Sequence, residues 1–410
     1  MIEAAGGPVW TPEYLLEQLE KRREFFLLDV RGRDAFDRFH IEGRDPLPAL
    51  NFPYSELLQL GSKADRTESL IAGIRQSIVG QLPRETQILT VCAKGESAGY
   101  VSEALRRMGY QAAILAGGIG AWAVHYAVHT IEESAELAVY QVSRPARGCL
   151  SYLIASRGQA VVIDPLRHLD PYLQLAREKG VTVTAIIDTH GHADHISGGT
   201  HLRERTGAPY YLHPYDAIHP IDVLPATFPY DYLSDGQQFS FGSQKLTALH
   251  VPGHTLGLVV FQLGDRYLFS GDSIFVKSIS RPDLGGKAET WAPLHARALR
   301  RLLRLPGKIN VLPGHFSSLS EADDGGRVTA SLDELKKNND GLVALQKESD
   351  EGFIRYLLAS LPAFVPEYVD IKRVNAGLIS PSENEAATLE TGKNVCALAQ
   401  AYATGEAKPA

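Results

Sequence analysis

The stretch DTHGHADHISGG, residues 188–199, places four side chains that can bind a metal ion within six positions. His190 and His192 alternate across a glycine, directly after an apolar run that predicts a buried strand. Asp194 and His195 follow at once, on a turn that leads into a predicted helix. A single histidine is usually an ordinary core or surface residue, but four donors this close together indicate a metal site.

Three more metal-type residues follow a shared pattern of strand, glycine and donor. VPGHT carries His254, FSGDS carries Asp272, and LPGHF carries His315. Donors that leave the ends of neighbouring strands can meet at one edge of a sheet. We therefore expect all three to face the cluster at residues 190–195.

The N-terminal part of the chain alternates strands with helices. Residues 11–24 predict a helix with Thr11 as its N-cap and an apolar face. FFLLDV (25–30) and QILTVC (87–92) are continuous apolar runs, which is typical of strands buried on both faces. This rhythm predicts a mostly parallel sheet that helices cover on both sides.

The pattern changes near residue 138. LSYLIASRGQAVVIDP predicts a hairpin that turns at Arg157 and Gly158, and strands then mix with βα units. This mixture predicts two sheets sandwiched between helices. After about residue 325 the chain is helical, and the small, polar tail at 382–410 is expected to be partly disordered.

The donor series resembles that of the metallo-β-lactamase superfamily, H-x-H-x-D-H…H…D…H, over about residues 138–320. Within the superfamily the chain looks like the persulfide dioxygenases, because Ala193 gives HADH and SRPDLGG (280–286) follows Asp272. The segment EYVDIKRVN (367–375) is similar to a bacterial branch that fuses this domain to rhodaneses.

This resemblance implies a mononuclear non-haem iron(II) held by His190, His254 and Asp272. Two imidazoles and one carboxylate leave three coordination positions open, so a substrate sulfur and O₂ can bind side by side. The remaining donors would orient these ligands and their waters; they are His192, Asp194, His195 and His315. A dinuclear zinc site that uses all seven donors is the alternative, since no ligand of a second metal is missing.

Two positions bear on the substrate of the implied dioxygenase. Arg281 is expected to bind the substrate carboxylate, by resemblance and because a guanidinium fork matches a carboxylate. Its alternative roles are a solvated surface arginine or a clamp on backbone carbonyls. Ser317 stands where glutathione-using relatives have a tyrosine, so glutathione, coenzyme A and other small thiols all stay open as carriers.

The stretch TVCAKGESAGYVSEAL places Cys92 at the end of a buried strand, with a helix beginning near Ser97. Loop amides and a helix N-terminus together stabilise an anion. A thiolate or a persulfide on Cys92 would be held there, although a buried structural cysteine is the other interpretation.

This part of the chain resembles a single-domain rhodanese over about residues 8–128. The matching pieces are LLDVR (27–31), the CAKGES loop and LAGGIGAW (115–122), and the family's nucleophile maps onto Cys92. Active rhodaneses often carry an arginine where this loop has Ser97, which leaves Lys94 as its only cation. Because a thiosulfate dianion would then bind weakly, Cys92 could instead take sulfur from a persulfide.

Together these observations predict an α/β protein with three parts. They are a rhodanese-like domain with a parallel sheet at 1–130, an αββα metallo-β-lactamase sandwich at 138–325, and a helical extension with a tail at 326–410. The predicted function is oxidation of a low-molecular-weight thiol persulfide, with glutathione persulfide as the first candidate, by O₂ to sulfite and thiol. It is coupled to sulfur transfer at Cys92 with thiosulfate or sulfite. The alternatives are a zinc thioester hydrolase like glyoxalase II with a rhodanese appendage, and a non-enzymatic sulfur carrier or sensor.

Composition limits the other possibilities. The net charge of −7 over 410 residues, without a basic patch, argues against nucleic-acid and membrane-surface partners. No apolar run reaches the roughly 18 residues of a membrane span, and MIEAAGGPVW carries no export signal. Three distant cysteines do not make a disulfide framework, so the cytoplasm is the expected location. Cys149 is interpreted as a packing residue, Cys396 has no motif around it, and relatives often form homo-oligomers.

Overall fold

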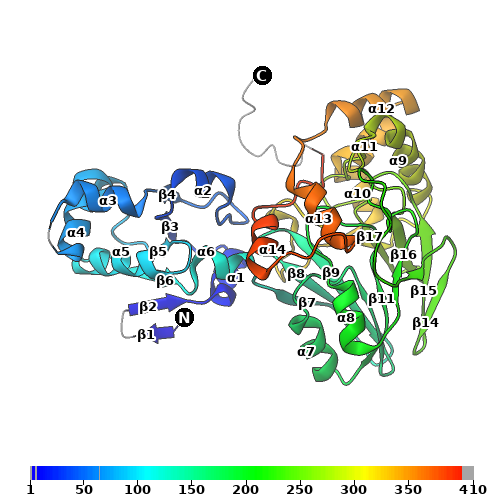
Figure 1. The fold of residues 1–410 in the computed structure, drawn as a ribbon, viewed down its shortest axis with the longest axis horizontal. Coiled ribbons are helices and arrows are strands. Elements are labelled where there is room, and N and C mark those ends of the chain that lie inside the picture. The colour runs from blue at the N-terminus through cyan, green and yellow to red at the C-terminus, as the bar shows by residue number, and fades with distance from the viewer. Residues whose placement is uncertain (1, 5–6, 64, 399–410) are drawn as a thin grey trace. The chain divides into compact units, whose positions relative to one another are not determined.

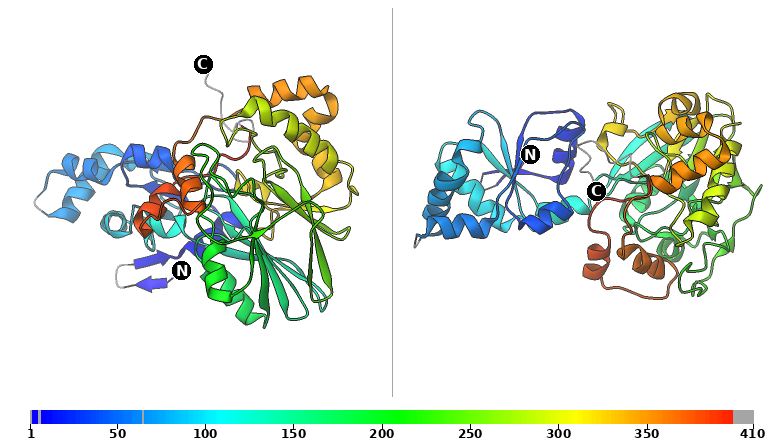
Figure 2. Two further views of the ribbon diagram at one scale, coloured as in Figure 1. Left: turned by 45° about the vertical axis from the view of Figure 1, so that its right-hand side comes forward. Right: turned by 90° about the horizontal axis from the view of Figure 1, so that it is seen from above.

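The structure is a computed structural model and describes residues 2–4, 7–63 and 65–398 (Figure 1). The chain forms two compact units. The first holds the residues up to 127 together with the short segments 144–147 and 318–320, and the second holds the remainder. Figure 2 gives two further views of both units.

The first unit is built on a six-stranded sheet in the order β1-β2-β6-β5-β3-β4. Only the β1–β2 pair is antiparallel, so the predicted parallel sheet is confirmed. Its strands are β1 (Ile2–Ala4), β2 (Gly7–Trp10), β3 (Phe26–Asp29), β4 (Ala49–Asn51), β5 (Ile88–Val91) and β6 (Ala112–Leu115).

Helices cover both faces of this sheet. They are α1 (Pro12–Glu20), α2 (Arg33–Arg38), α3 (Tyr54–Gly61), α4 (Arg66–Ser77), α5 (Glu96–Arg107) and α6 (Gly118–Ala123). Side chains alternate across the sheet: Leu27 and Leu89 pack in the cluster of α1 and α6, whereas Leu28 and Ile88 pack in the cluster of α3, α4 and α5. Burial on both faces explains why β3 and β5 consist mainly of apolar residues.

The second unit contains two sheets. One has seven strands in the order β13-β12-β11-β10-β9-β8-β7, and the other has six in the order β14-β15-β16-β17-β18-β19. The seven are β7 (Ala127–Glu133), β8 (Ala138–Arg144), β9 (Cys149–Ser156), β10 (Gln159–Ile163), β11 (Thr182–Ile187), β12 (Tyr210–Leu212) and β13 (Asp231–Tyr232). The six are β14 (Gln238–Phe241), β15 (Gln244–His250), β16 (Val259–Leu263), β17 (Tyr267–Gly271), β18 (Asn310–Pro313) and β19 (Ala330–Ser331).

The predicted hairpin is confirmed as β9 and β10, which pair in antiparallel fashion. Its turn holds Arg157 and Gly158, whose φ angles are 45° and 80°. Two successive positive φ angles define the tight turn that matches the twist of paired strands.

Helices also cover the sheets of the second unit (Figure 1). They are α7 (Asp170–Glu178), α8 (Gly199–Thr206), α9 (Ala288–Leu302), α10 (Leu332–Asn338), α11 (Asp340–Lys347), α12 (Asp350–Ala359), α13 (Glu367–Asn375) and α14 (Glu383–Leu389). Apolar residues of α9 to α12 pack on β16, β17 and β18, and α8 lies on β11 and β12. The predicted α/β class is confirmed, with two sheets sandwiched between helices in this unit.

The polar tail departs from its prediction. Residues 383–389 form α14, and Cys396, Ala397 and Leu398 are buried. The expected disorder is therefore wrong up to residue 398, because three apolar side chains near the end of the segment find a place in the core. The prediction for residues 399–410 lies outside the described residues.

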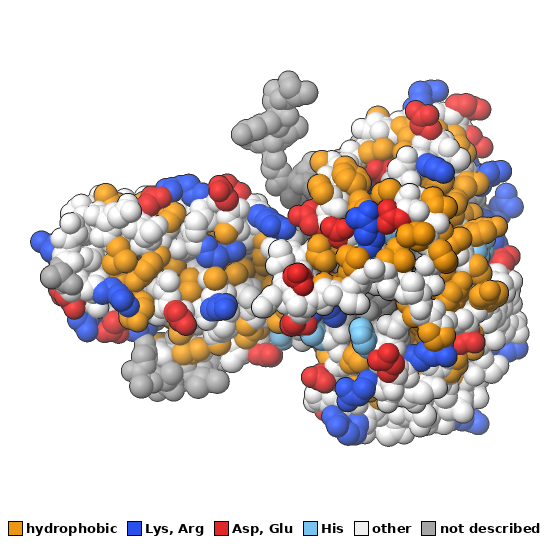
Figure 3. Space-filling model, viewed as in Figure 1, with side chains coloured by type: hydrophobic (Ala, Val, Ile, Leu, Met, Phe, Trp, Pro, Cys, Tyr) orange, Lys and Arg blue, Asp and Glu red, His pale blue; other side chains and the backbone are white. Residues whose placement is uncertain are grey.

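Two surface properties bear on the expected partners. On the face drawn in Figure 3, basic and acidic side chains are interspersed over each unit. Within the described part of the chain, no helix combines the length and the apolar composition that crossing a membrane requires.

Candidate metal centre

A chain of hydrogen bonds fixes the loop that carries His190. Asp164 follows β10 and accepts from the backbone N–H of Thr189 at 2.6 Å and from its hydroxyl at 2.9 Å. That hydroxyl lies 2.9 Å from His190 Nδ1. Since the hydroxyl donates to Asp164, it is left to accept from Nδ1. This arrangement leaves His190 Nε2 as the nitrogen with a lone pair, as a metal ligand requires.

Asp216 joins the His190 loop to the His254 loop. One carboxylate oxygen accepts from Gly191 N at 2.8 Å and from the Thr255 hydroxyl at 2.5 Å. The other accepts from Gly257 N at 2.8 Å. A Cβ at Gly257 would lie 2.6 Å from the Asp216 carboxyl carbon, so only glycine allows this approach.

His190, His254 and Asp272 converge as the sequence predicts, with all three side chains fully buried. Asp272 Oδ2 lies 3.4 Å from His254 Nε2 and 3.9 Å from His190 Nε2. The second polar atom of His254 and that of Asp272 already have partners. His254 Nδ1 donates to the Arg281 carbonyl at 2.7 Å, and Asp272 Oδ1 lies 2.6 Å from His315 Nδ1.

The three inward atoms of this triad are buried and have no hydrogen-bond partner among the described residues. Buried polar atoms without partners are costly, and native proteins rarely keep several together. A bound cation would satisfy all three at once. The triad of His190, His254 and Asp272 therefore fits a metal ion.

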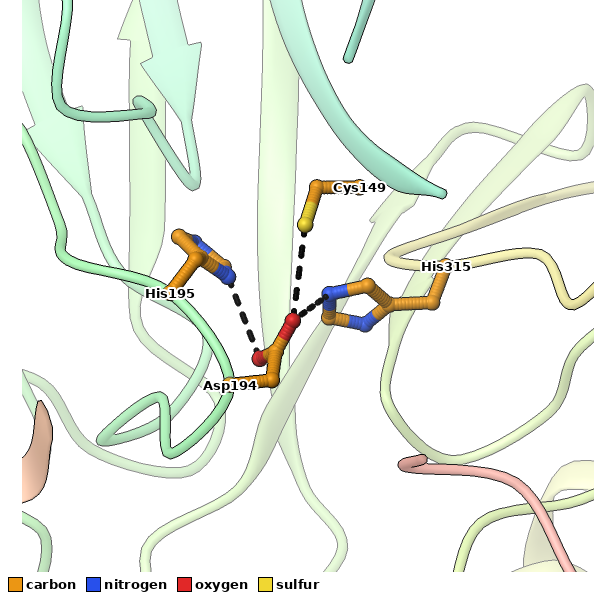
Figure 4. A group of neighbouring side chains, drawn as sticks. All are labelled: Cys149, Asp194, His195 and His315. Carbon is orange, nitrogen blue, oxygen red and sulfur yellow. Dashed lines mark hydrogen bonds and ion pairs between the residues drawn. The ribbon is translucent and has the colours of Figure 1, made fainter. Parts of the chain in front are cut away.

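A second donor group lies nearby and consists of Cys149, Asp194, His195 and His315 (Figure 4). Asp194 is at its middle: Oδ1 lies 3.1 Å from His195 Nδ1, and Oδ2 accepts from Cys149 Sγ at 3.4 Å. Oδ2 also lies 2.8 Å from His315 Nε2. The Asp194 carboxylate thus has three neighbours that can neutralise or bond to it.

His192 belongs to neither group. Its ring lies beside that of His190, with centroids 4.2 Å apart, but its Nε2 faces Asp164 Oδ1 at 3.2 Å. Together with Asp164 and Asp188 it forms a third cluster of possible ligands. The structure thus divides the predicted donors into three sets.

Electrostatics separates the triad from the second group. Burial lowers the pKa of His190 well below its usual value and also lowers the pKa of His254, so both imidazoles stay neutral. Burial alone would also lower the pKa of His195, but Asp194 and Cys149 raise it to about 10. His315 is likewise desolvated, yet Asp194 and Asp272 raise its pKa well above the usual value. Without a metal, ion pairs stabilise the second group, and they reach the triad only at Asp272, which pairs with His315.

The comparisons with known proteins agree with this geometry. The model of the metallo-beta-lactamase superfamily matches residues 144–315, and that of the rhodanese-like domain matches residues 11–125. The uncharacterized protein ML0493 of Mycobacterium leprae is 31% identical over 192 residues, which cover 42% of this chain and 87% of that protein. The chain belongs to the metallo-β-lactamase superfamily. It also carries an N-terminal rhodanese-like domain.

Two further relatives show how far the likeness extends. A hydroxyacylglutathione hydrolase of Xanthomonas euvesicatoria pv. vesicatoria (strain 85-10) is 33% identical over 170 residues, or 42% of this chain. The match spans only 61% of that hydrolase. The structure of a metallo-beta-lactamase from Staphylococcus aureus subsp. aureus COL has a TM-score of 0.52 and 29% identity, covering 60% of this chain and 74% of that one. Together with the donor groups, these matches support a metal-binding enzyme of the superfamily.

In the metallo-β-lactamase domain, Arg281 has a different role from the one expected. Its side chain donates to both oxygens of Asp283, at 2.6 and 2.7 Å, and to three backbone carbonyls. The carbonyls are those of Pro362, Ala363 and Val395, at 3.2 to 3.3 Å. Every N–H of the guanidinium is used, so none is left for a substrate carboxylate. The expected substrate contact is corrected to a backbone clamp, the alternative that the sequence also allowed.

Sequence reasoning did not assign four residues that the metallo-β-lactamase domain brings to its metal centre. Cys149 was expected only to pack, and Cys396 was given no role, yet both thiols lie among the donors. Lys372 Nζ donates to the Gly191 carbonyl at 2.5 Å, and Asp216 braces two ligand loops. Of these four residues, only Lys372 lies in a segment that the sequence analysis singled out. That segment, EYVDIKRVN (367–375), is similar to one found in relatives that are fused to rhodaneses.

In the rhodanese-like domain, Cys92 stands at the end of β5. Gly95 N donates to Cys92 Sγ at 3.1 Å, from a residue with φ of +101° that an L side chain rarely adopts. A Cβ on Gly118 would lie 2.3 Å from the Cys92 carbonyl oxygen, so the loop is closely packed from behind. Ser97 lies half-buried in the first turn of α5, and Lys94 is exposed. The loop therefore holds the sulfur against a backbone amide beside the N-terminus of α5, as an anion site does.

Proposed function

We propose that the chain is a persulfide dioxygenase with a mononuclear non-haem iron, coupled to a sulfurtransferase that acts through Cys92. One observation carries the proposal: two imidazoles and one carboxylate converge at His190, His254 and Asp272, while the neighbouring His192 faces Asp164. Two histidines and one carboxylate on one face are the ligand set of non-haem iron oxygenases.

Each residue of the triad has a defined task in this proposal. His190 and His254 bind through Nε2, because their Nδ1 atoms are engaged by Thr189 and by the Arg281 carbonyl. Asp272 binds through Oδ2, because Oδ1 is engaged by His315. The bound iron would supply oxygen activation, and the triad leaves room for a sulfur ligand and O₂ on adjacent positions.

The overall reaction balances as R–S–S⁻ + O₂ + H₂O → R–SH + SO₃²⁻ + H⁺. The sulfane sulfur is oxidised, O₂ is reduced, and the thiol carrier is returned. At Cys92 the exchange is Cys92–SH + R–S–SH → Cys92–S–SH + R–SH. Joining the two sites in one chain raises the effective concentration of one site's product at the other. Run in reverse, this exchange supplies persulfide to the iron. Alternatively, the outer sulfur passes to sulfite and removes it as thiosulfate, Cys92–S–SH + SO₃²⁻ → Cys92–SH + S₂O₃²⁻.

A second candidate is a zinc thioester hydrolase. Its support is the likeness to hydroxyacylglutathione hydrolases and the second donor group around Asp194. His192 Nδ1 is also a buried nitrogen without a hydrogen-bond partner among the described residues. Two zinc ions would use these atoms and would activate a water molecule instead of O₂.

Metal analysis and an oxygen electrode separate the two candidates. Protein purified without oxygen is expected to hold one iron per chain. It should consume O₂ and form sulfite when glutathione persulfide is added, and coenzyme A persulfide in a parallel run identifies the carrier. Two zinc ions per chain, with hydrolysis of lactoylglutathione and no oxygen uptake, would establish the hydrolase instead.

A further inference from the structure

The C-terminal segment 394–398 forms part of the wall of the metal centre. Its backbone pairs with that of residues 279–281: Arg281 N donates to the Cys396 carbonyl at 2.9 Å, and Leu398 N donates to the Ile279 carbonyl at 3.1 Å. The preceding residue is held too, since Val395 N is 2.7 Å from the Tyr368 hydroxyl. The backbone on both sides of Cys396 is therefore fixed.

The same residue that holds Cys396 also holds a metal ligand. Arg281 donates its backbone N–H to Cys396 and accepts the Nδ1 proton of His254 on its carbonyl. Its guanidinium reaches the Val395 carbonyl at 3.3 Å. A short backbone connection thus joins the C-terminal segment to the triad and sets the position of Cys396 relative to it.

The Cys396 thiol lies among the donor atoms. It is fully buried, and its sulfur lies within 4.8 Å of ligand atoms of Asp272 and His315. No hydrogen bond of the sulfur is found within the described residues, and Asp272 Oδ2 is equally buried and without such a partner. Asp272 belongs both to the triad and to the group with His315 and Cys396, whereas Cys396 groups with neither His190 nor His254. A cation held at Asp272 therefore has the thiol on its Asp272 side.

Cys149 provides an internal comparison. Both thiols are fully buried, and both lie near His315. Cys149 donates to Asp194 and groups with no member of the triad, whereas Cys396 groups with Asp272. Of these two cysteines, only Cys396 is therefore grouped with a residue of the triad, Asp272.

We propose that the Cys396 thiol is an additional sulfur ligand of the metal centre, contributed by the C-terminal segment. Thiolates are soft ligands that bind iron, zinc and cobalt ions. Binding follows Cys396–SH + M²⁺ → Cys396–S⁻–M²⁺ + H⁺, so one proton is released. The thiolate would fill one of the positions that the triad leaves open, until a substrate sulfur replaces it. This inference rests on the proposed triad but not on the identity of the metal or on the persulfide reaction.

Cobalt substitution of the full chain tests the inference. Protein freed of metal and loaded with Co²⁺ should show a sulfur-to-cobalt charge-transfer band in the near ultraviolet. The band should persist in Cys149→Ser and disappear in Cys396→Ser, whereas the visible ligand-field bands should remain in both because the triad still binds. An unchanged charge-transfer band in Cys396→Ser would overturn the inference.

A second measurement avoids any change at Cys396, in case that variant does not fold. The chain has three cysteines, so Cys92→Ser combined with Cys149→Ser leaves Cys396 as the only thiol. Zinc X-ray absorption of this protein should show a sulfur neighbour at about 2.3 Å. Nitrogen and oxygen neighbours alone would overturn the inference, and oxygen uptake by the iron-loaded wild-type chain tests the proposed function separately. Failure of the wild type to bind any metal would overturn both.

Discussion

The Cys92 loop and the metal centre hold their reactive groups in opposite ways. The loop is contiguous, from Cys92 to Ser97, and the bond that reaches its sulfur comes from a backbone amide. The metal centre takes ligands from three separate strand ends, and each ligand is held by another residue, such as Thr189, Arg281 or His315. A site made of backbone depends on local conformation, whereas a site made of side chains depends on distant contacts.

The largest expected effect is at Cys92. Cys92→Ala removes the proposed nucleophile, so sulfur transfer from glutathione persulfide to cyanide should fall by about 10³-fold or more. Oxygen uptake should be unchanged, because no triad residue is touched. Equal transfer rates in the wild type and the variant would refute the assignment of Cys92.

The reciprocal change is Asp272→Ala. This change removes a proposed metal ligand and leaves His315 without its Asp272 partner. Loss of a residue that only supports a ligand costs up to about 100-fold in metal affinity, so iron content and oxygen uptake should fall by at least about 100-fold. Thiocyanate formation from glutathione persulfide and cyanide should stay at the wild-type rate. If both activities fell together in a folded variant, the two sites would not be independent as the comparison requires.

Arg281→Lys distinguishes a backbone clamp from a substrate contact. Lysine has three donors in place of five and loses the fork to Asp283, so chemical denaturation should show a loss of about 2–3 kcal/mol. The KM for glutathione persulfide should be unchanged. A raised KM with unchanged stability would restore the substrate-binding role.

Asp164→Asn tests the chain of contacts that ends at His190. The amide cannot accept at both of its positions, so the contacts to the Thr189 amide and hydroxyl are weakened and His190 loses its orientation. Iron affinity, measured by competition with a chelator, should fall by about 10- to 100-fold. The variant Asp231→Asn, at a half-exposed strand end of the same domain, is the control and should bind iron normally.

The smallest expected effect is tighter binding of thiosulfate at the Cys92 loop. Ser97→Arg adds a cation at the first turn of α5, so the KM for thiosulfate should fall by about 3- to 10-fold, in line with one added charge contact. The rate with glutathione persulfide should change little. An unaltered KM for thiosulfate would mean that backbone amides alone set anion binding in this loop.

Contiguous patterns explain what the sequence could predict. Each correctly predicted feature lies within one short segment: β3, β5, the turn at Arg157 and the cluster that begins at His190. Within such a segment, the periodicity of apolar residues and the spacing of metal donors can be read directly from the sequence. The meeting of His254 and Asp272 also followed from strand ends at one sheet edge.

Distant pairings explain what could not be predicted. Cys396 reaches the metal centre through pairing with residues 279–281, which no local pattern records. For Arg281, the acceptors that decide its role are backbone carbonyls more than eighty positions away, and the most distant of them is that of Val395. Such contacts depend on the completed tertiary structure and not on residue type alone.

The pairing of residues 394–398 with residues 279–281 also sets the order of events during synthesis. A ribosome makes the triad long before it makes Cys396, so an emerging chain exposes ligands whose wall is still missing. The metal centre gains this part of its wall only after residues 394–398 have left the exit tunnel and paired with residues 279–281. We therefore expect metal loading to be complete only after this segment has been translated. A truncated product that ends before it would have a metal centre that is open on one side.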